Sequence, residues 1–349
     1  MKLSMQIGYS GGFAQSVEKV KALESAGMDI VYVAEAYGYD APTLMGYMAA
    51  ETESIQIASG ILPIYTRTPS LLAMTAAGLD ELSGGRAILG LGTSGPQVIE
   101  GFHGVPYTAP VGRTREVIDI CRKLWAREEP LVHDGRYYQL PLPEDEGTGL
   151  GKALKMITHP VRPRIPIHIA SLGPKNVQMT AELADGWLPI LFHPQKARGV
   201  WGDDLDIGLA KRTPDLGELD VIAGGLLCIG KEEDVAPFRG LMSGIVALYV
   251  GGMGAREKNF YNQLFCRYGY EAEAKQIQDL YLDGKKAEAA QAVPQSFLEE
   301  TSLCGDEGYL TERIAQYREA GVTVLNIEPI AGDLTGMQET VAKVKEIAG

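Results

Sequence analysis

Residues 55–104 read IQIASGILPIYTRTPSLLAMTAAGLDELSGGRAILGLGTSGPQVIEGFHG. The run contains two short apolar segments, 56–60 and 87–91, on either side of an amphipathic segment, 69–82. This order predicts a strand, a helix and a second strand. Both predicted strands lead into glycine-bearing loops. Because α/β proteins place ligands at strand exits, the run predicts part of the fold and part of a binding site.

The same strand–helix unit recurs along the whole chain, without the signature of antiparallel hairpins. Eight such units predict an α/β protein with a (β/α)8 TIM barrel. A doubly wound sheet is the alternative, and the even spread of eight units favours the barrel. The predicted strands are residues 4–9, 29–34, 56–60, 87–91, 167–170, 186–191, 221–229 and 324–328.

Two segments depart from the repeat. Residues 127–165 are rich in proline and glycine and predict an irregular, lid-like loop. Residues 232–300 read as mostly helical and predict an insertion between the seventh and eighth strands. We therefore expect one domain that spans residues 1–349.

The composition limits the possible partners. The net charge of −13 argues against nucleic-acid binding, because contact with phosphates requires a basic face. We find no signal-like N-terminus and no apolar stretch of about 18 residues, so we expect a cytoplasmic protein without a membrane partner. Four scattered cysteines predict neither a disulfide framework nor a zinc site.

One glycine pattern follows the fourth predicted strand. Gly90, Gly92 and Gly95 match the GxGxxG spacing of dinucleotide-binding loops, but Pro96 follows directly and the strand is not the first. We favour a backbone loop that approaches some other ligand, since glycines let the main chain come close.

A possible anion site follows the fifth predicted strand. Residues 171–176 read SLGPKN and open a helix, and the free N–H groups of a helix start favour an anion such as phosphate. An ordinary capped helix is the alternative. Arg67 lies just after the third strand and either adds charge to such a ligand or is a surface arginine.

Two further strand ends carry ionisable side chains. Glu35 ends a buried strand, so its carboxylate requires a partner, either a ligand or an arginine. His193 follows the sixth strand and is a candidate site residue. The five histidines show no HxH or HExxH spacing, so we predict no metal site.

Several motifs resemble the luciferase-like family of flavin and deazaflavin barrels, most closely its F420-dependent branch. They are YVAEAYGYDAP (32–42), SGILPIYTRTP (59–69), LDELSGGRAILGLGTSGPQVIEG (79–101), GLGKALKMITHP (149–160), SLGPKNVQMTAELADGWLPI (171–190) and ALYVGGMGA (247–255).

The resemblance implies a TIM barrel with coenzyme F420, or alternatively FMN, across the strand exits. It implies a bulge with a non-prolyl cis peptide at Gly60–Ile61 behind the ring, and contact of the ring with Glu35. The ring edge is then expected at Thr93, Ser94, Gly95, Pro96, Gln97 and Val98, and the phosphate end at Ser171, Gly173, Pro174 and Lys175.

Two departures from the family narrow the expected reaction. Ala36 and Gly95 stand where the sugar-phosphate dehydrogenases of the family carry a histidine and a glutamate. We therefore expect hydride transfer that reduces a C=C or C=N bond of a small organic substrate, with Glu35, Tyr37 and His193 as catalytic candidates and Tyr65 as a further proton donor.

The sequence is also compatible with two other functions. One is an FMN-dependent monooxygenase that works with a separate reductase, and the other is a non-catalytic flavin-binding protein. The family commonly forms homodimers, so we expect a homodimer here.

Overall fold

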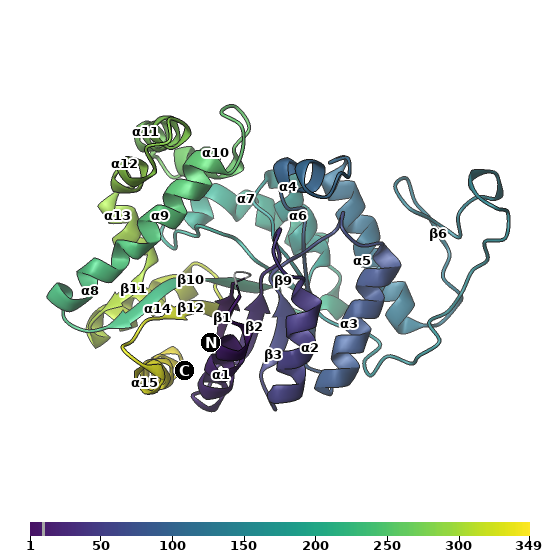
Figure 1. The fold of residues 1–349 in the computed structure, drawn as a ribbon, viewed down its shortest axis with the longest axis horizontal. Coiled ribbons are helices and arrows are strands. Elements are labelled where there is room, and N and C mark those ends of the chain that lie inside the picture. Colours follow the sequence, from purple (N-terminus) through teal and green to yellow (C-terminus); the bar gives the residue numbers. More distant parts are fainter. Residues whose placement is uncertain (9–10) are drawn as a thin grey trace.

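Eight parallel strands close into a barrel in the computed structural model, which describes residues 1–8 and 11–349 (Figure 1). Pairing of β9 with β10 and of β12 with β1 completes the ring. The strands are, in sheet order, β1 (Lys2–Ile7), β2 (Ile30–Val33), β3 (Gln56–Ser59), β5 (Ala87–Gly92), β8 (Ile167–Ile169), β9 (Gly186–Trp187), β10 (Asp220–Ile229) and β12 (Val324–Pro329).

All eight predicted strands and the TIM barrel are confirmed, and the doubly wound sheet is excluded. Tyr9, the last residue of the first predicted strand, lies outside the described residues. Strands such as β2 and β5 are buried along their whole length, as expected for a parallel sheet covered on both faces.

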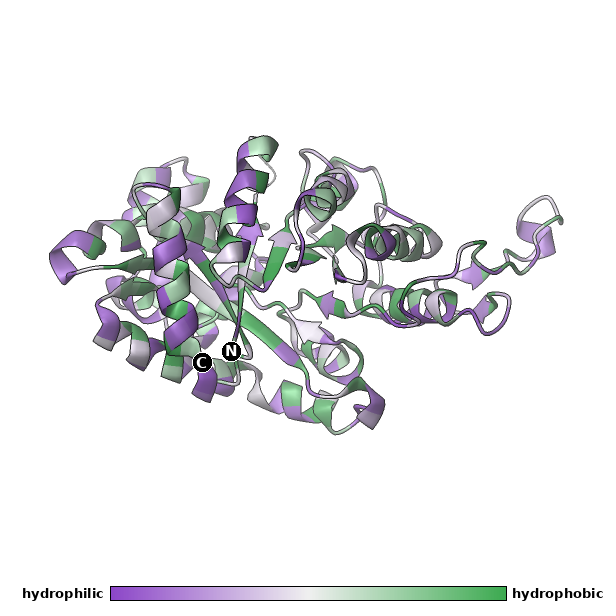
Figure 2. Cartoon of the chain, turned by 90° about the horizontal axis from the view of Figure 1, so that it is seen from below, coloured by the Kyte–Doolittle hydropathy of each residue, from purple (hydrophilic) through white to green (hydrophobic). Residues whose placement is uncertain are grey.

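Helices surround the strands, and each helix mixes hydrophobic and hydrophilic residues (Figure 2). They are α1 (Phe13–Ser25), α2 (Ala41–Glu51), α3 (Pro69–Ser83), α5 (Pro110–Ala126), α6 (Pro174–Leu183), α7 (Ala197–Leu209), α14 (Glu307–Glu319) and α15 (Leu334–Ala348). The buried residues of the first helix, Val17, Val20 and Leu23, show that its apolar side faces the interior. The chain ends lie side by side, where the Met1 amino group donates to the Ala348 carbonyl oxygen at 2.9 Å.

The turn that follows α3 explains the sequence SGGR at residues 83–86. Gly84 ends the helix with a φ of 66°, in the left-handed region that favours glycine. Arg86 then donates hydrogen bonds to the carbonyl oxygens of Ala49, Thr52 and Ile55. This arginine therefore ties α3 to the end of α2 and the start of β3, at the barrel end opposite the strand exits.

The predicted helical insertion is confirmed between β10 and β12. It consists of α8 (Glu232–Arg239), α9 (Leu241–Ala247), the π-helical turn η3 (Leu248–Gly252), α10 (Phe260–Arg267), α11 (Glu271–Leu282), α12 (Lys286–Gln291) and α13 (Gln295–Thr301). The sequence pattern missed β11 (Leu303–Gly305), which pairs with the end of β10 outside the ring. Three residues are too few to show a strand period.

One helical run within this insertion, Glu232–Gly252, is long and apolar enough to cross a membrane. About a third of its most apolar window, 33%, is buried in the structure. A single run of this kind is weak evidence for a membrane span, because core helices share these properties. The absence of a membrane partner stays a prediction.

Residues 127–165 form an arm that extends sideways past α5 (Figure 1). The arm is irregular apart from a short hairpin of β6 (His133–Asp134) and β7 (Gln139–Leu140) and the 3-10 turn η1 (Glu144–Glu146). The arm lies beside the barrel and not across the strand exits, so the structure does not support the predicted lid (Figure 1).

A buried polar pair lies inside the barrel. The Tyr32 phenol and the His168 Nδ1 atom lie 2.8 Å apart, and Gly186 leaves room for the imidazole. Burial lowers the pKa of His168 to about 4, so the ring is neutral at pH 7. His168 therefore has a structural role inside the barrel.

Candidate functional site

The predicted ligand-contacting loops follow consecutive strands of the barrel. In sheet order, β2 is followed by β3, then β5, then β8. Glu35 and Tyr37 follow β2, the bulge at Gly60 follows β3, and the other two loops follow β5 and β8. The structure therefore brings these sequence-distant segments together as one arc of strand exits.

A bulge separates β3 from the short β4 (Leu62–Pro63), which pairs with the end of β5. The Gly60–Ile61 peptide is cis, as the resemblance implied. The Gly60 amide donates to the Val33 carbonyl oxygen at 2.7 Å, and the Gln6 side chain donates to the Gly60 carbonyl oxygen at 3.3 Å. Backbone and side-chain contacts from β2 and β1 thus hold the bulge. Gln6 was not recognised in the sequence, because it falls within a strand pattern.

The glycines of the GxGxxG pattern make room for this bulge. A Cβ atom on Gly90 would lie 1.7 Å from the Ser59 carbonyl oxygen, and one on Gly92 would lie 2.8 Å from the Ile61 side chain. The Ser59 hydroxyl also bonds both the amide and the carbonyl of Gly90 at 2.8 Å. Gly90 and Gly92 therefore serve strand packing, which corrects the prediction that they let the backbone approach a ligand.

Glu35 and Arg67 form a bidentate ion pair within the arc. The two N–O distances are 2.6 and 2.8 Å, and the side chains are 8% and 14% exposed, respectively. The Ala41 amide, in the first turn of α2, donates to the same carboxylate at 2.9 Å. The arginine alternative for Glu35 is thus confirmed. Arg67 is neither a surface residue nor free for an anion, because its charge is already paired.

The loop after β5 carries a hydroxyl network. Ser94 adopts a φ of 54° and is exposed, and Gly95 precedes the short helix α4 (Pro96–Gly101). The Tyr107 phenol donates to the Thr93 hydroxyl at 3.0 Å. Tyr107 was missed in the sequence, because it lies between α4 and α5 in a stretch without any period. Gln97 is exposed and Val98 is half-buried, so both lie at the surface of the arc.

The loop after β8 presents the start of α6. Gly173 is the N-cap residue, no side chain caps the helix, and Pro174 and Lys175 are exposed. The Ser171 hydroxyl instead pairs with the Thr180 hydroxyl at 2.8 Å and is buried. Its side chain therefore supports the loop, which corrects its predicted role as a ligand contact.

Tyr37 and His193 differ sharply in exposure. Tyr37 is 65% exposed and packs against Phe102, with ring centroids 6.0 Å apart. His193 has no exposed surface, and its Nε2 atom lies 2.7 Å from a Glu300 carboxylate oxygen. Burial lowers the pKa of His193, and Glu300 opposes this shift. A buried ring cannot touch a substrate, so this geometry does not support a catalytic role for His193.

Two observations test whether the arc fits a cofactor with a flat ring, a hydroxylated chain and a phosphate. The start of α6 has no side-chain cap and carries the exposed Lys175, which suits an anion. The buried Oδ1 atom of Asn176 has no hydrogen-bond partner among the described residues, which suits a hydroxyl donor. The residues present therefore fit such a group. Within the described chain, no group of three or more His, Cys, Asp or Glu side chains is placed to hold a metal ion.

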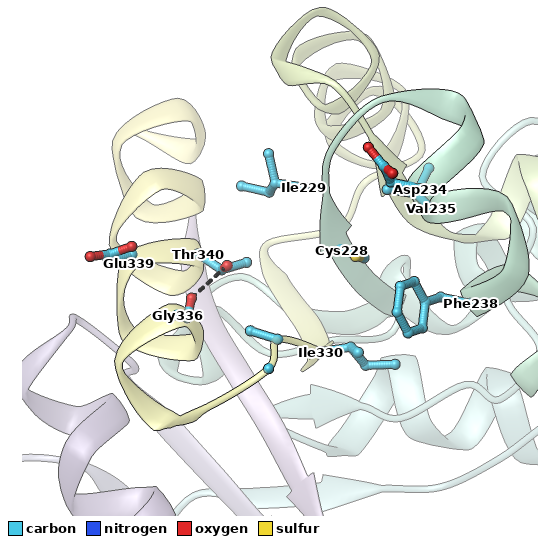
Figure 3. A pocket seen from close by; sticks show the side chains of 11 residues that line it. Cys228, Ile229, Asp234, Val235, Phe238, Ile330, Gly336, Glu339 and Thr340 are labelled. Atoms are coloured by element: carbon cyan, nitrogen blue, oxygen red, sulfur yellow. Dashed lines mark hydrogen bonds between the residues drawn. The ribbon is translucent and has the colours of Figure 1, made fainter.

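A cavity of about 520 Å³ lies elsewhere, at the exits of β10 and β12 between α8 and α15 (Figure 3). It is lined by Cys228, Ile229, Val235, Phe238 and Ile330, with Asp234 and Glu339 among its polar residues. None of the predicted site residues line it. Its acidic groups would repel a phosphate, so it is no substitute for the arc.

Comparisons with known proteins agree with this arrangement. A protein of Mycobacterium tuberculosis provisionally named a coenzyme F420-dependent oxidoreductase is 41% identical over 347 residues, which is 99% of each chain. The 5,10-methylenetetrahydromethanopterin reductase of Archaeoglobus fulgidus is 28% identical over 90% of this chain and 89% of its own. The solved structure of the coenzyme F420-dependent tetrahydromethanopterin reductase of Methanopyrus kandleri superposes with a TM-score of 0.78, at 24% identity, over 98% of this chain and 97% of its own.

The sequence profile of one family also spans the strands that carry the arc. This profile describes the luciferase-like monooxygenases, and it matches residues 1–324 of the chain. This match covers all four exits of the arc and the insertion after β10. The chain therefore belongs to the luciferase-like monooxygenase family of enzymes.

Proposed function

We propose that this enzyme binds coenzyme F420 along the arc and catalyses hydride transfer to a small organic substrate. The observation that carries the proposal is the arc itself, in which the paired Glu35, the bulge at Gly60 and the uncapped start of α6 follow consecutive strands. The names of the mycobacterial and archaeal relatives support F420 as the cofactor.

Different parts of the arc would hold different parts of the cofactor. The bulge at Gly60 and Ile61 and the residues Thr93 to Val98 would contact the ring, and Gly173 and Lys175 would hold the phosphate end. Reduced F420 supplies a hydride, and the protein supplies orientation and exclusion of water. Arg67 would act indirectly, since it holds Glu35 in place.

Reduction of a C=C or C=N bond is the reaction that we favour. A Cβ atom on Gly95 would find only one atom within 4.0 Å, so the position where sugar-oxidising relatives carry an acid is open space. The side chain of Ala36 offers no proton acceptor either. The exposed rings of Tyr37 and Phe102 border the same side of the arc and suit an apolar or aromatic substrate.

Titration with F420 and with FMN, followed by fluorescence quenching, tests the cofactor. We expect F420 to bind at micromolar affinity or better and FMN to bind much more weakly. Replacing Lys175 by alanine is expected to weaken F420 binding by about three- to ten-fold at low salt, because an exposed charge on an anion contributes about 1 kcal/mol. The matched control is Lys211→Ala, which removes an exposed lysine just after α7. Tight FMN binding without F420 binding would refute the proposal.

An FMN-dependent monooxygenase is the second candidate, because the matching family profile describes monooxygenases. Oxygen consumption with reduced FMN and a test substrate distinguishes it from the first candidate. A non-catalytic flavin carrier would bind the cofactor but show no turnover with any reducible substrate.

We also propose a homodimer that forms through α2 and α3. These helices pack against each other and expose several large apolar side chains, which include Tyr47, Leu71, Met74 and Leu82. Gly46 and Gly78 lie on the same helices, and a Cβ atom on either would meet no atom within 4 Å. Small residues and exposed apolar side chains allow two such faces to pack closely.

Replacing Met74 by glutamate is expected to convert the dimer to a monomer, since it would bury a charge in the centre of this face. Light scattering coupled to size-exclusion chromatography measures the mass directly. Leu150→Glu is the control, because Leu150 is an equally apolar and more exposed side chain on the arm. A dimer that survives Met74→Glu would place the interface elsewhere.

A further inference from the structure

Tyr107 reaches the proposed ring-binding loop from outside the strands. Its phenol oxygen lies 3.0 Å from the Thr93 hydroxyl and 3.4 Å from the Ser94 carbonyl oxygen. Its backbone amide donates to the Glu100 carboxylate of α4 at 3.0 Å. The residue is therefore anchored to α4 at its backbone and to the loop after β5 at its side chain.

A second tyrosine fixes the orientation of the Tyr107 ring. The centroids of Tyr65 and Tyr107 lie 5.1 Å apart, with an angle of 34° between the rings. The Tyr65 phenol donates to the Thr108 carbonyl oxygen at 2.8 Å, so Tyr65 is itself held in place. Burial raises the pKa of Tyr107, which keeps its phenol protonated and able to donate.

This contact sets the direction in which the Thr93 hydroxyl donates. A threonine hydroxyl has one proton and two lone pairs. Because Tyr107 donates to Thr93, one lone pair is occupied and the Thr93 proton is left to point elsewhere. The acceptor nearest to it within the loop, the Ser94 carbonyl oxygen, lies 3.4 Å away, near the limit of a hydrogen bond.

The backbone of the loop indicates that this arrangement is built rather than incidental. Ser94 adopts a φ of 54°, which costs a non-glycine residue about 1 kcal/mol or more. Such a conformation directs the Thr93 side chain and the start of α4 differently from an extended loop. Residues in this region of φ and ψ cluster at ligand sites.

We propose that Tyr107 is a positioning residue, which holds the Thr93 hydroxyl as a hydrogen-bond donor toward the bound cofactor ring. The inference rests on the proposed function, because it requires the ring to lie along the loop after β5. Tyr107 itself does not contact the ring and acts through Thr93. The proposal thus predicts a specific dependence of cofactor affinity on two residues taken together.

A double-mutant cycle tests this coupling, with the dissociation constant of F420 measured by fluorescence quenching. Tyr107→Phe is expected to weaken binding by about five-fold and Thr93→Val by about ten-fold, since a neutral hydrogen bond contributes about 1 kcal/mol. The double variant is expected to bind no more weakly than Thr93→Val alone. Thr93→Ser keeps the hydroxyl and is expected to bind within about two-fold of the unaltered protein.

Each outcome decides a separate point. Unaltered affinity in Tyr107→Phe, or losses that multiply in the double variant, would overturn the inference while leaving F420 binding intact. Failure of Thr93→Ser to restore affinity would also overturn it, provided that its thermal unfolding midpoint is unchanged. No F420 binding by the unaltered protein would overturn the proposed function and this inference with it.

Discussion

Replacing Gly90 by alanine is expected to lower the free energy of unfolding by about 3 kcal/mol or more. The new Cβ atom would lie 1.7 Å from the Ser59 carbonyl oxygen and 2.8 Å from its carbonyl carbon. Both are backbone atoms, and the Ser59 hydroxyl clamps β3 to Gly90 at 2.8 Å. Neither strand can move apart without losing these bonds, so the cost is at the upper end of what overpacking usually causes. Urea denaturation followed by circular dichroism measures it.

Two neighbouring glycines provide graded controls in the same segment. Gly95→Ala is expected to leave stability nearly unchanged, because the nearest atom to its Cβ would be the Gln97 side-chain oxygen at 4.0 Å. Gly92→Ala is expected to lose an intermediate amount of stability, because the obstructing atoms, at 2.8 and 2.9 Å, belong to the Ile61 side chain and not to the backbone. Equal losses at Gly90 and Gly95 would contradict the assignment of Gly90 to strand packing.

The barrel could be predicted from the sequence because each of its strands repeats the same local pattern. Residues 83–92 show why the secondary structure could be predicted from the sequence more accurately than the roles of individual residues. The SGGR portion forms a helix end, which is a local feature that sequence signals describe. The hydrogen bonds of Arg86 instead reach carbonyl oxygens 31 to 37 positions away, and no local pattern indicates them. Gly90 and Gly92 match the spacing of a ligand-binding loop. They are required instead by close contact with Ser59 and Ile61, in and just after β3, and no local pattern reveals that contact.

The side-chain pairings of the site were harder to predict, because they depend on contacts between distant segments. The partner of Glu35 lies 32 positions away, and a charged residue at a strand end gives no indication of which neighbour it contacts. His193 was placed at a strand end correctly, but α13 contributes Phe297 beside the ring and the nearby Glu300 to cover it. Tyr107 lies in a connection without periodicity, so only the hydrogen bond to Thr93 identifies it.

Replacing Arg67 by methionine is expected to lower the free energy of unfolding by about 3 kcal/mol. The substitution removes both hydrogen bonds to Glu35 and leaves a carboxylate that is only 8% exposed without a counter-charge. Leaving one member of a buried pair uncompensated usually costs about 3–5 kcal/mol, and the partial exposure of Arg67, at 14%, places the estimate at the lower end. Chemical denaturation measures the loss.

The reason for this loss is the charge left on Glu35, so removing that charge should reverse it. The double variant Glu35→Gln/Arg67→Met is expected to recover more than half of the stability, since the amide oxygen still accepts from the Ala41 amide. Arg198→Met is the matched control, because Arg198 binds Asp206 with the same two-point geometry at the surface. Surface ion pairs contribute little, so this variant should unfold like the unaltered protein. If Arg67→Met and Arg198→Met proved equally harmless, the pair would not hold Glu35 in place, and the arc would lose the contact that fixes its first member.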